Sequence, residues 1–188
     1  AGPAIGGWIA TYWHINVLFY CSAFTAIFSI LILLRLKETL VEKEKKSLKL
    51  LKLKRDELIE KRVLLPSVIL FLSVFSFGVV LTIIPDFSTH LGIQNKGLFF
   101  AVFTLSSLGI RLIAGRTSDK HGRVAVMRVA SLFMVAAMTA LAFTESKTVL
   151  LLSGVIFGSA VGMYSPTTTA WVVDLSLDKY RGRALATM

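Results

Sequence analysis

The sequence predicts an all-α integral membrane protein whose helices form a bundle with five full spans. Three observations lead to this fold class. The chain has 188 residues, of which 55% are hydrophobic, and its mean hydropathy of +0.72 is higher than a soluble domain needs. The apolar residues fall into runs of about twenty, the length at which an α-helix crosses a hydrocarbon core. The basic residues gather in every second connection between these runs.

Each of the five runs is expected to be a helix, because a strand that crosses a membrane is shorter and alternates with a period of two. The predicted spans are residues 12–34, 63–84, 97–114, 124–143 and 148–173. Residues 1–11 are interpreted as the tail of an earlier helix followed by a short turn.

The basic residues predict the orientation of the spans. Segment 35–62 holds eleven of them, the connection after the third span with its flanks holds five, and the stretch after the fifth span holds three. The other two connections hold only Lys96 and Lys147. By the positive-inside rule, the basic side is cytoplasmic in an inner or plasma membrane. This distribution also explains the net charge of +10 without a nucleic-acid partner.

Segment 35–62 is predicted to be a basic cytoplasmic loop. Glu42 with Lys46, and Glu57 with Lys61, form acid-first pairs four residues apart, which favour a helix. Two interpretations stay open: an amphipathic helix on the anionic inner leaflet, or a solvated charged linker. We exclude a nucleic-acid arm, because no aromatic or glycine residue interleaves the lysines.

Residues 115–123 are predicted to form a tight polar turn between the third and fourth spans. Gly115 and Gly122 permit close helix approach or a positive φ at its two ends. Asp119 can cap a helix N-terminus or pair with a cation. The neighbouring cations are Arg116, Lys120 and Arg123. A generic turn that only satisfies the positive-inside rule is the less favoured alternative.

Two further stretches carry a physical signal. Residues 2–7 are rich in glycine around one proline, which suits close helix packing. The residues concerned are Gly2, Pro3, Gly6 and Gly7. Residues 174–184 place an acid at a helix end, followed by cations that can pair with it. These residues are Asp174, Arg181, Gly182 and Arg183. The fifth span also carries Gly154, Gly158 and Gly162 at intervals of four, which predicts close packing along one face.

Together these stretches resemble motifs of the major facilitator superfamily of secondary transporters. Residues 115–123 resemble the signature loop G-x-x-x-D-(R/K)-x-G-R in its second copy, between helices eight and nine. Val124 departs from the pattern, because the family usually has a basic residue there. Residues 2–7 resemble the tail of the helix-five motif of proton-driven drug antiporters. Residues 174–184 resemble the loop D-x(6)-R-G-x-A between helices ten and eleven.

The resemblance implies a partial major facilitator bundle, mostly its C-terminal half. Residues 1–34 are then the end of the N-terminal bundle, with the tail of helix five and helix six. Residues 35–62 are the central loop, and residues 63–188 contain helices seven to ten and the start of eleven. The chain is therefore interpreted as a fragment that does not transport alone. The resemblance also implies that Asp119 and the neighbouring arginines form a cytoplasmic latch.

Few ionisable residues lie within the spans, where each would cost about 2.5–3.5 kcal/mol. Arg111 is expected to snorkel to the cytoplasmic interface. Asp86 follows Pro85 at the outer end of the second span, as a solvated terminus or at the mouth of a cavity. Aromatic residues beside hydroxyls suit an amphiphilic organic solute. The candidate cavity residues are Asn16, Ser73, Phe75, Ser76, Phe77, Thr82, Asp86, Phe87, Arg111, Tyr164 and Thr168.

The function that the resemblance implies is secondary active transport of a small organic solute by alternating access, with proton-coupled efflux favoured. A metabolite uptake symporter, and a membrane sensor or scaffold with the same fold, are the alternatives. The expected partners are the lipid bilayer, the solute and protons. We expect no enzyme, metal or cofactor, because the sequence has no phosphate loop, zinc-ligand spacing or nucleophile elbow. The carboxylate that carries the coupling proton is expected in helices outside this chain.

Overall fold

The computed structural model describes residues 2–36, 61–176 and 181–188, and within these ranges the regular structure is helical. A 3-10 turn at Lys61–Val63 precedes α4. The α-helices are α1 (Gly2–Tyr12), α2 (Ile15–Leu33), α4 (Leu64–His90), α5 (Leu98–His121), α6 (Arg123–Ala142), α7 (Lys147–Leu175) and α8 (Arg181–Thr187). Five of them, α2 and α4 to α7, are long and apolar enough to cross a membrane. The all-α fold with five spans is therefore confirmed. Segment 35–62, for which a helix and a solvated linker were both left open, lies mostly outside the described residues.

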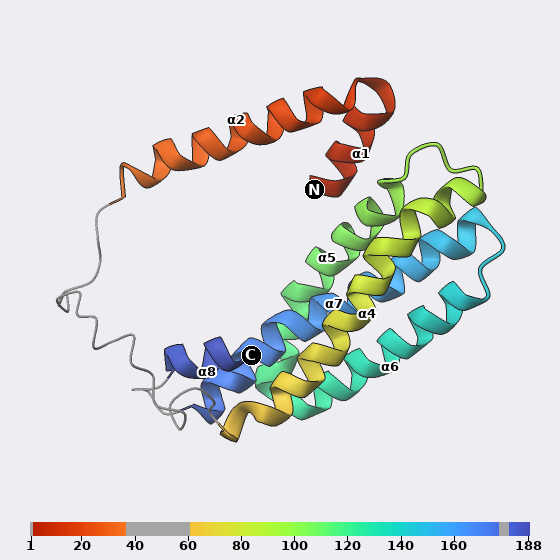
Figure 1. Ribbon diagram of the computed structural model, residues 1–188. Helices are drawn as coiled ribbons and strands as arrows, with labels where there is room; N and C mark the ends of the chain where they lie inside the picture. Colours follow the sequence, from red (N-terminus) through yellow and green to blue (C-terminus); the bar gives the residue numbers. More distant parts are fainter. Residues whose placement is uncertain (1, 37–60, 177–180) are drawn as a thin grey trace.

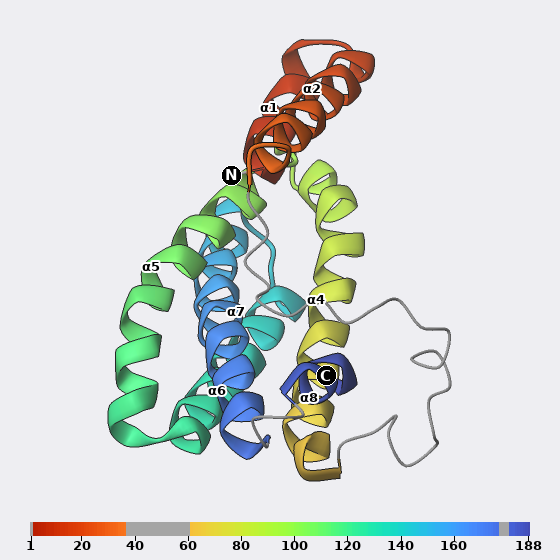
Figure 2. The same cartoon turned by 90° about the vertical axis from the view of Figure 1, so that its left-hand side faces the viewer.

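Helices α4 to α7 form an antiparallel bundle around α7 (Figure 1). Helix α7 packs against α4, α5 and α6, and Figure 2 shows it between α5 and α4. Half of the residues in the most apolar stretch of α7 are buried, a larger share than in the other spans. Helix α8 lies across one end of the bundle, where Val63, Val172 and Ala184 form a small second core.

Three glycines at intervals of four bring α7 close to α5. A Cβ atom on Gly158 would collide with the backbone carbonyl of Phe103, and one on Gly162 would lie 2.6 Å from the carbonyl oxygen of Ser107. A Cβ atom on Gly154 would also be crowded, by the ring of Phe99. The predicted small-residue face is therefore confirmed as the surface on which these two helices pack, a device common between membrane helices.

Helices α1 and α2 stand apart from the bundle (Figure 1). No residue of the described helix α2 is buried, whereas α1 reaches the start of α5. There, a Cβ atom on Gly7 would lie 2.7 Å from the Cα atom of Gly97. The outer faces of the spans are apolar and exposed, with Leu112 at 79% as an example. Such faces suit contact with lipid, as expected of a multi-pass integral membrane protein.

The third span is longer than the sequence predicts. Helix α5 continues through Gly115 to His121, so the prediction of a turn that begins at Gly115 is wrong. In this added part, Thr117 donates a hydrogen bond to the carbonyl of Ile113 (2.9 Å), and Lys120 and His121 interact favourably with the helix dipole in the last turn. Gly122, with φ of 87°, makes the turn alone, in a conformation that glycine adopts without strain.

Two prolines lie inside helices rather than at their ends. Helix α4 passes through Pro85 to His90. The sequence suggested that Asp86 lies at a helix terminus, but it lies inside the helix. In α7, Pro166 lies within the helix and lacks the N–H that would otherwise bond to the carbonyl of Gly162. The remaining boundaries of the predicted spans agree with the helices to within a few residues.

Candidate functional site

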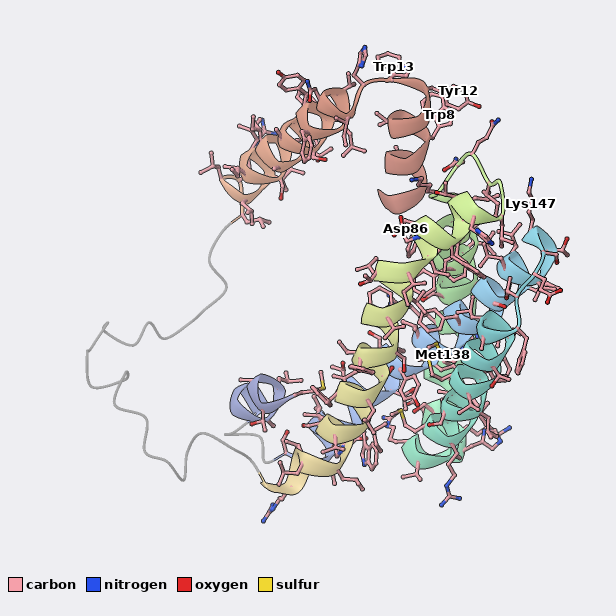
Figure 3. The ribbon with its side chains drawn as sticks, turned by 45° about the vertical axis from the view of Figure 1, so that its right-hand side comes forward. Trp8, Tyr12, Trp13, Asp86, Met138 and Lys147 are labelled. Atoms are coloured by element: carbon pink, nitrogen blue, oxygen red, sulfur yellow. The ribbon has the colours of Figure 1, made fainter. Side chains whose placement is uncertain are left out.

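The two ends of the bundle differ in charge. The end at which α5 and α7 finish and α4 and α6 begin is called the basic end here. It carries Arg62, Arg116, Lys120 and Arg123. The opposite end holds Lys147 and the aromatic side chains Trp8, Tyr12 and Trp13 (Figure 3). Aromatic residues of this kind favour the membrane–water interface. The separation agrees with the alternation of basic residues along the sequence.

Arg123 joins three helices at the basic end. Its Nη1 donates to Asp119 Oδ1 (2.5 Å) and to Ser118 Oγ (3.0 Å) on α5. Its Nε donates to Asp174 Oδ2 (2.9 Å) on α7. Because Arg123 is the first residue of α6, a single guanidinium fastens the ends of α5 and α7 to the start of α6. We call Arg123, Asp119, Asp174 and Ser118 the ion-pair cluster.

The ion pairs of the cluster lie at the surface of the protein. The Arg123 side chain is 23% exposed, while Asp119 and Asp174 are 69% and 53% exposed. Exposed ion pairs contribute about 0.2–1 kcal/mol each, because water screens the charges. A modest motion of one helix end therefore suffices to break a pair.

The cluster unites two of the three stretches that the sequence singles out. Asp119 was expected to pair with one of three neighbouring cations, and in the structure it pairs with Arg123. Arg116 and Lys120 are exposed and form no ion pair with a described residue. The cations expected for Asp174 were those that follow it. Its partner in the described chain is Arg123, while residues 177–180 and the side chains of Arg181 and Arg183 lie outside the description.

A hollow of about 420 Å³ opens between α4, α5, α7 and the end of α8. We call it the central hollow. Its wall is mostly apolar, with Leu70, Phe77, Phe103 and Val161 among the lining residues. Its polar lining residues are Ser73, Thr104, Ser107, Arg111, Tyr164, Ser165 and Thr169. Hollows of this size, apolar with a few polar groups, are typical of sites for small organic molecules.

Four of the sequence-predicted cavity residues line the central hollow: Ser73, Phe77, Arg111 and Tyr164. Phe77 stacks against Phe157 with 6.3 Å between ring centroids. Tyr164 is buried, and its hydroxyl lies 2.6 Å from Ser131 Oγ on α6. The tyrosine therefore contributes its ring to the wall while its hydroxyl bonds to the neighbouring helix.

The other predicted cavity residues lie elsewhere. Asn16 is exposed on α2, and Ser76 donates a hydrogen bond to the carbonyl of Leu72 (3.2 Å) on its own helix. Asp86 is exposed on α4, near the end that faces α1 (Figure 3). Phe75 and Thr82 are exposed. Phe87 lines a separate apolar hollow between α4 and α6. The buried hydroxyl of Thr168 donates a hydrogen bond to Met127 Sδ on α6.

Several lining residues were missed by the sequence reasoning. Four polar residues line the central hollow but were not among the predicted cavity residues: Thr104, Ser107, Ser165 and Thr169. A usable signal was present, because Phe103, Ser107 and Arg111 recur every fourth residue. Residues at that interval share one helix face.

Arg111 lies deeper along its helix than the sequence indicates. With α5 ending at His121, Arg111 is ten residues, or about 15 Å, from the helix end at a rise of ~1.5 Å per residue. It lines the central hollow and also an adjoining hollow of about 460 Å³ that reaches Asp174. It forms no ion pair or hydrogen bond within the described chain. Because residues 115–121 of this helix are polar, Arg111 lies about one turn before the polar part of α5, so the side chain can still snorkel to the interface.

No group of three or more His, Cys, Asp or Glu side chains among the described residues could hold a metal ion. Long apolar helices, an ion-pair cluster at one end and a hydroxyl-lined hollow between the helices are typical of a membrane transporter. The comparison with protein families agrees. All of the chain, residues 1–188, matches the Major Facilitator Superfamily. The protein belongs to this family, whose members are transporters and not enzymes.

Two curated relatives are similar to part of the chain. Over 109 residues, which are 57% of this chain and 28% of the relative, it is 29% identical to the quinolone resistance protein NorA of Staphylococcus aureus. Over 121 residues, 63% of this chain and 31% of the relative, it is 26% identical to multidrug resistance protein 1 of Bacillus subtilis. The chain thus spans less than a third of the length of these relatives. No solved structure matches it.

Proposed function

We propose that the chain is part of a secondary active transporter that exports a small organic solute by alternating access, in exchange for protons. The observation that supports this most directly is the ion-pair cluster, which ties α5, α6 and α7 together at one end of the bundle. In this proposal the basic end faces the cytoplasm of an inner or plasma membrane, as the positive-inside rule favours.

The proposal assigns each helix a place in the family's architecture. Helix α1 is the tail of helix five and α2 is helix six, which end the N-terminal bundle. Segment 35–62 is the central cytoplasmic loop. Helices α4 to α7 are helices seven to ten, and α8 begins helix eleven. The central hollow is then one wall of the solute path, and rocking of the two halves exposes it to each side in turn.

The ion-pair cluster acts as a cytoplasmic latch in this scheme. Asp119 and Asp174 hold the ends of α5 and α7 against α6 while the cytoplasmic side is closed. Because both acids are more than half exposed, water can replace the broken pairs at small cost when the side opens. A latch made in this way biases an equilibrium between two states without locking either of them.

Efflux is favoured over uptake by two observations. The glycine-rich stretch 2–7 resembles the helix-five tail of antiporters, and its Gly7 lies close to Gly97 before the start of α5. Both curated relatives are named for drug resistance. An uptake symporter would require the opposite direction of net flux, which can be measured.

The test is flux through the complete protein in inside-out membrane vesicles with an imposed inside-acid pH gradient. Two fluorescent probes are used: 8-anilino-1-naphthalenesulfonate, an aromatic anion, and N-phenyl-1-naphthylamine, the same ring system without the sulfonate. We expect accumulation of at least one probe, abolished by a protonophore. Asp119→Asn should lower the flux several-fold at normal expression, because it removes one of the two acids from the latch.

Glu145→Gln is the matched control, since Glu145 is an exposed acid at the opposite end of the bundle. It should leave the flux unchanged. Asp86→Asn should leave coupling to protons intact, because the coupling carboxylate is expected outside this chain. Vesicles that accumulate neither probe beyond vesicles without the protein would contradict the proposal. So would accumulation in right-side-out vesicles only, which would indicate uptake.

A further inference from the structure

We propose that the central hollow selects solutes that carry an anionic group on an apolar body, and that Arg111 recognises the anion. This inference rests on the proposed function and names the class of solute that the transporter accepts. It is carried by three features of the structure: an arginine without an ion-pair partner among the described residues, serine hydroxyls that form no hydrogen bond there, and an aromatic wall.

Arg111 has no acid to pair with in the described part of the chain. The four described acids are Asp86, Glu145, Asp119 and Asp174. The latter two both bind Arg123. Asp86 lies toward the opposite end of the bundle (Figure 3), where Glu145 stands in the connection between α6 and α7. Arg111 is exposed and lines the largely apolar central hollow, and no described residue uses its five donors. Asp174 lines the adjoining hollow but binds Arg123. A positive charge within a membrane span is costly unless water or an anion solvates it.

Hydroxyl donors surround the same space. In these helices a hydroxyl usually donates to the carbonyl four residues back, as Thr104 does to Phe100 (2.7 Å) and Thr169 to Ser165 (3.0 Å). The side chains of Ser73, Ser107 and Ser165 form no such bond within the described residues, although all three line the central hollow. Ser73 and Ser107 are only 7% and 5% exposed. Ser165 is exposed. A hydroxyl that lines the hollow without a protein partner is available to a bound solute.

The donors converge around Arg111. Ser107 lies one turn before Arg111 on α5, so both side chains lie on the same face of the helix. Ser165 lines both hollows that meet at Arg111. A carboxylate, sulfonate or phosphate beside Arg111 could thus accept hydrogen bonds from the guanidinium and from serine hydroxyls at once. Arginine suits this role, because its planar fork matches the geometry of oxyanions.

The rest of the wall fits an aromatic body. Phe77 and Phe103 line the hollow and pack against each other, with 5.8 Å between their ring centroids. Phe157 supports both rings from behind. A hollow of about 420 Å³ holds two or three fused or linked rings. The expected solute is therefore an aromatic organic anion or zwitterion, with its acidic group toward the basic end.

The test measures binding to the complete protein in nanodiscs of zwitterionic lipid, with the signal of empty nanodiscs subtracted. The two probes are the anilinonaphthalenesulfonate and the phenylnaphthylamine named above, which differ by one sulfonate. We expect Arg111→Gln to raise the Kd of the sulfonate by at least about tenfold, equivalent to ~1.4 kcal/mol, and to leave the Kd of the uncharged probe unchanged. Arg111→Lys should restore part of the loss, because it keeps the charge but not the fork.

Arg128→Gln is the matched control. It removes the same charge from an exposed position on α6 that lines neither hollow, and it should change neither Kd. If Arg111→Gln does not yield folded protein, Ser165→Ala replaces it, with an expected loss of about threefold for the sulfonate alone. Equal weakening of both probes, or no weakening of either, overturns the proposal. So does a wild-type protein that does not bind the sulfonate.

An anionic lipid carries the same chemistry as a soluble anion, and the nanodiscs can distinguish the two. If phosphatidylglycerol in the disc raises the apparent Kd of the sulfonate, and Arg111→Gln removes this competition, the site binds anions and a lipid can occupy it. If phosphatidylglycerol has no effect, the site binds anions and prefers a soluble solute. Binding is measured without a pH gradient, so this test is independent of the flux test. A result that refutes the anion preference leaves the proposed transport untouched, and a result that refutes transport leaves the anion preference untouched.

Discussion

Replacing Arg123 with glutamine removes both ion pairs of the cluster at once, which makes it the most direct perturbation of the proposed latch. The wild-type guanidinium donates to Asp119 and Asp174 at 2.5 and 2.9 Å. Because these acids are 69% and 53% exposed, each pair is assigned about 0.5–1 kcal/mol, the upper part of the range for exposed pairs. The loss of both is then about 1–2 kcal/mol, which shifts the equilibrium between closed and open states about 5- to 30-fold.

The assay is the rate at which a membrane-impermeant methanethiosulfonate modifies a cysteine at position 169. Thr169 lines both hollows, so Thr169→Cys reports access from the basic end. Cys21 is exposed and is replaced by serine beforehand. In inside-out vesicles of the complete protein we expect Arg123→Gln to speed the modification about 5- to 30-fold. Asp119→Asn and Asp174→Asn should each have a smaller effect, since each removes one pair.

Several outcomes would refute the latch. An unchanged rate in Arg123→Gln would show that the ion pairs do not oppose opening. If Asp119→Asn speeds the modification as much as Arg123→Gln does, while Asp174→Asn leaves the rate unchanged, then Arg123 acts only at the turn between α5 and α6. Glu145→Gln is the control for a general loss of acidic charge, and the rate in this variant should equal that of the parent.

Two further predictions concern the packing that supports the hollow. Gly158→Ala should destabilise the complete protein by about 1–3 kcal/mol, because the added Cβ atom collides with the carbonyl of Phe103 and separates α5 from α7. Gly109→Ala is the control, because its Cβ atom would meet nothing within 4 Å, and its Tm in detergent should stay within about a degree or two of the parent. An equal fall of the Tm in the Gly158 and Gly109 variants would contradict the packing argument. Tyr164→Phe and Ser131→Ala should each lower the free energy of unfolding by about 0.5–1.5 kcal/mol, because each removes the 2.6 Å hydrogen bond between the two hydroxyls. The double variant should lose no more than the larger single loss, whereas additive losses would show that the two hydroxyls act separately.

The spans could be predicted from the sequence because a membrane leaves few alternatives. A segment that crosses hydrocarbon must satisfy its backbone internally, so an apolar run of the right length is a helix. The method fails where a helix leaves the hydrocarbon. Residues 115–121 are polar and were therefore read as a turn, although they form the last two turns of α5. Hydropathy measures the part of a helix that lies in lipid and says little about the part that extends into water.

The ion-pair cluster divides into a part that sequence could predict and a part that it could not. Asp119 and Arg123 are four residues apart on either side of Gly122, so their pairing was among the expected ones. Asp174 is separated from Arg123 by 51 positions, and only the packing of α7 between α5 and α6 brings it there. The central hollow depends likewise on how each helix is rotated about its axis. Spans that are apolar all round carry little information about that rotation.

Pro166 gives α7 the geometry of a short lever. Val161, Tyr164 and Ser165, which line the central hollow, come before this residue, and Asp174 comes after it. The proline leaves the carbonyl of Gly162 without its usual partner. From Pro166 to Asp174 the arm is eight residues, or about 12 Å. A tilt of only about 3° at this point moves the carboxylate by ~0.6 Å, which stretches a bond of 2.9 Å to the limit of a hydrogen bond. In the proposed transporter, a solute that displaces the wall beside Tyr164 would need very little travel to release the far end of the helix.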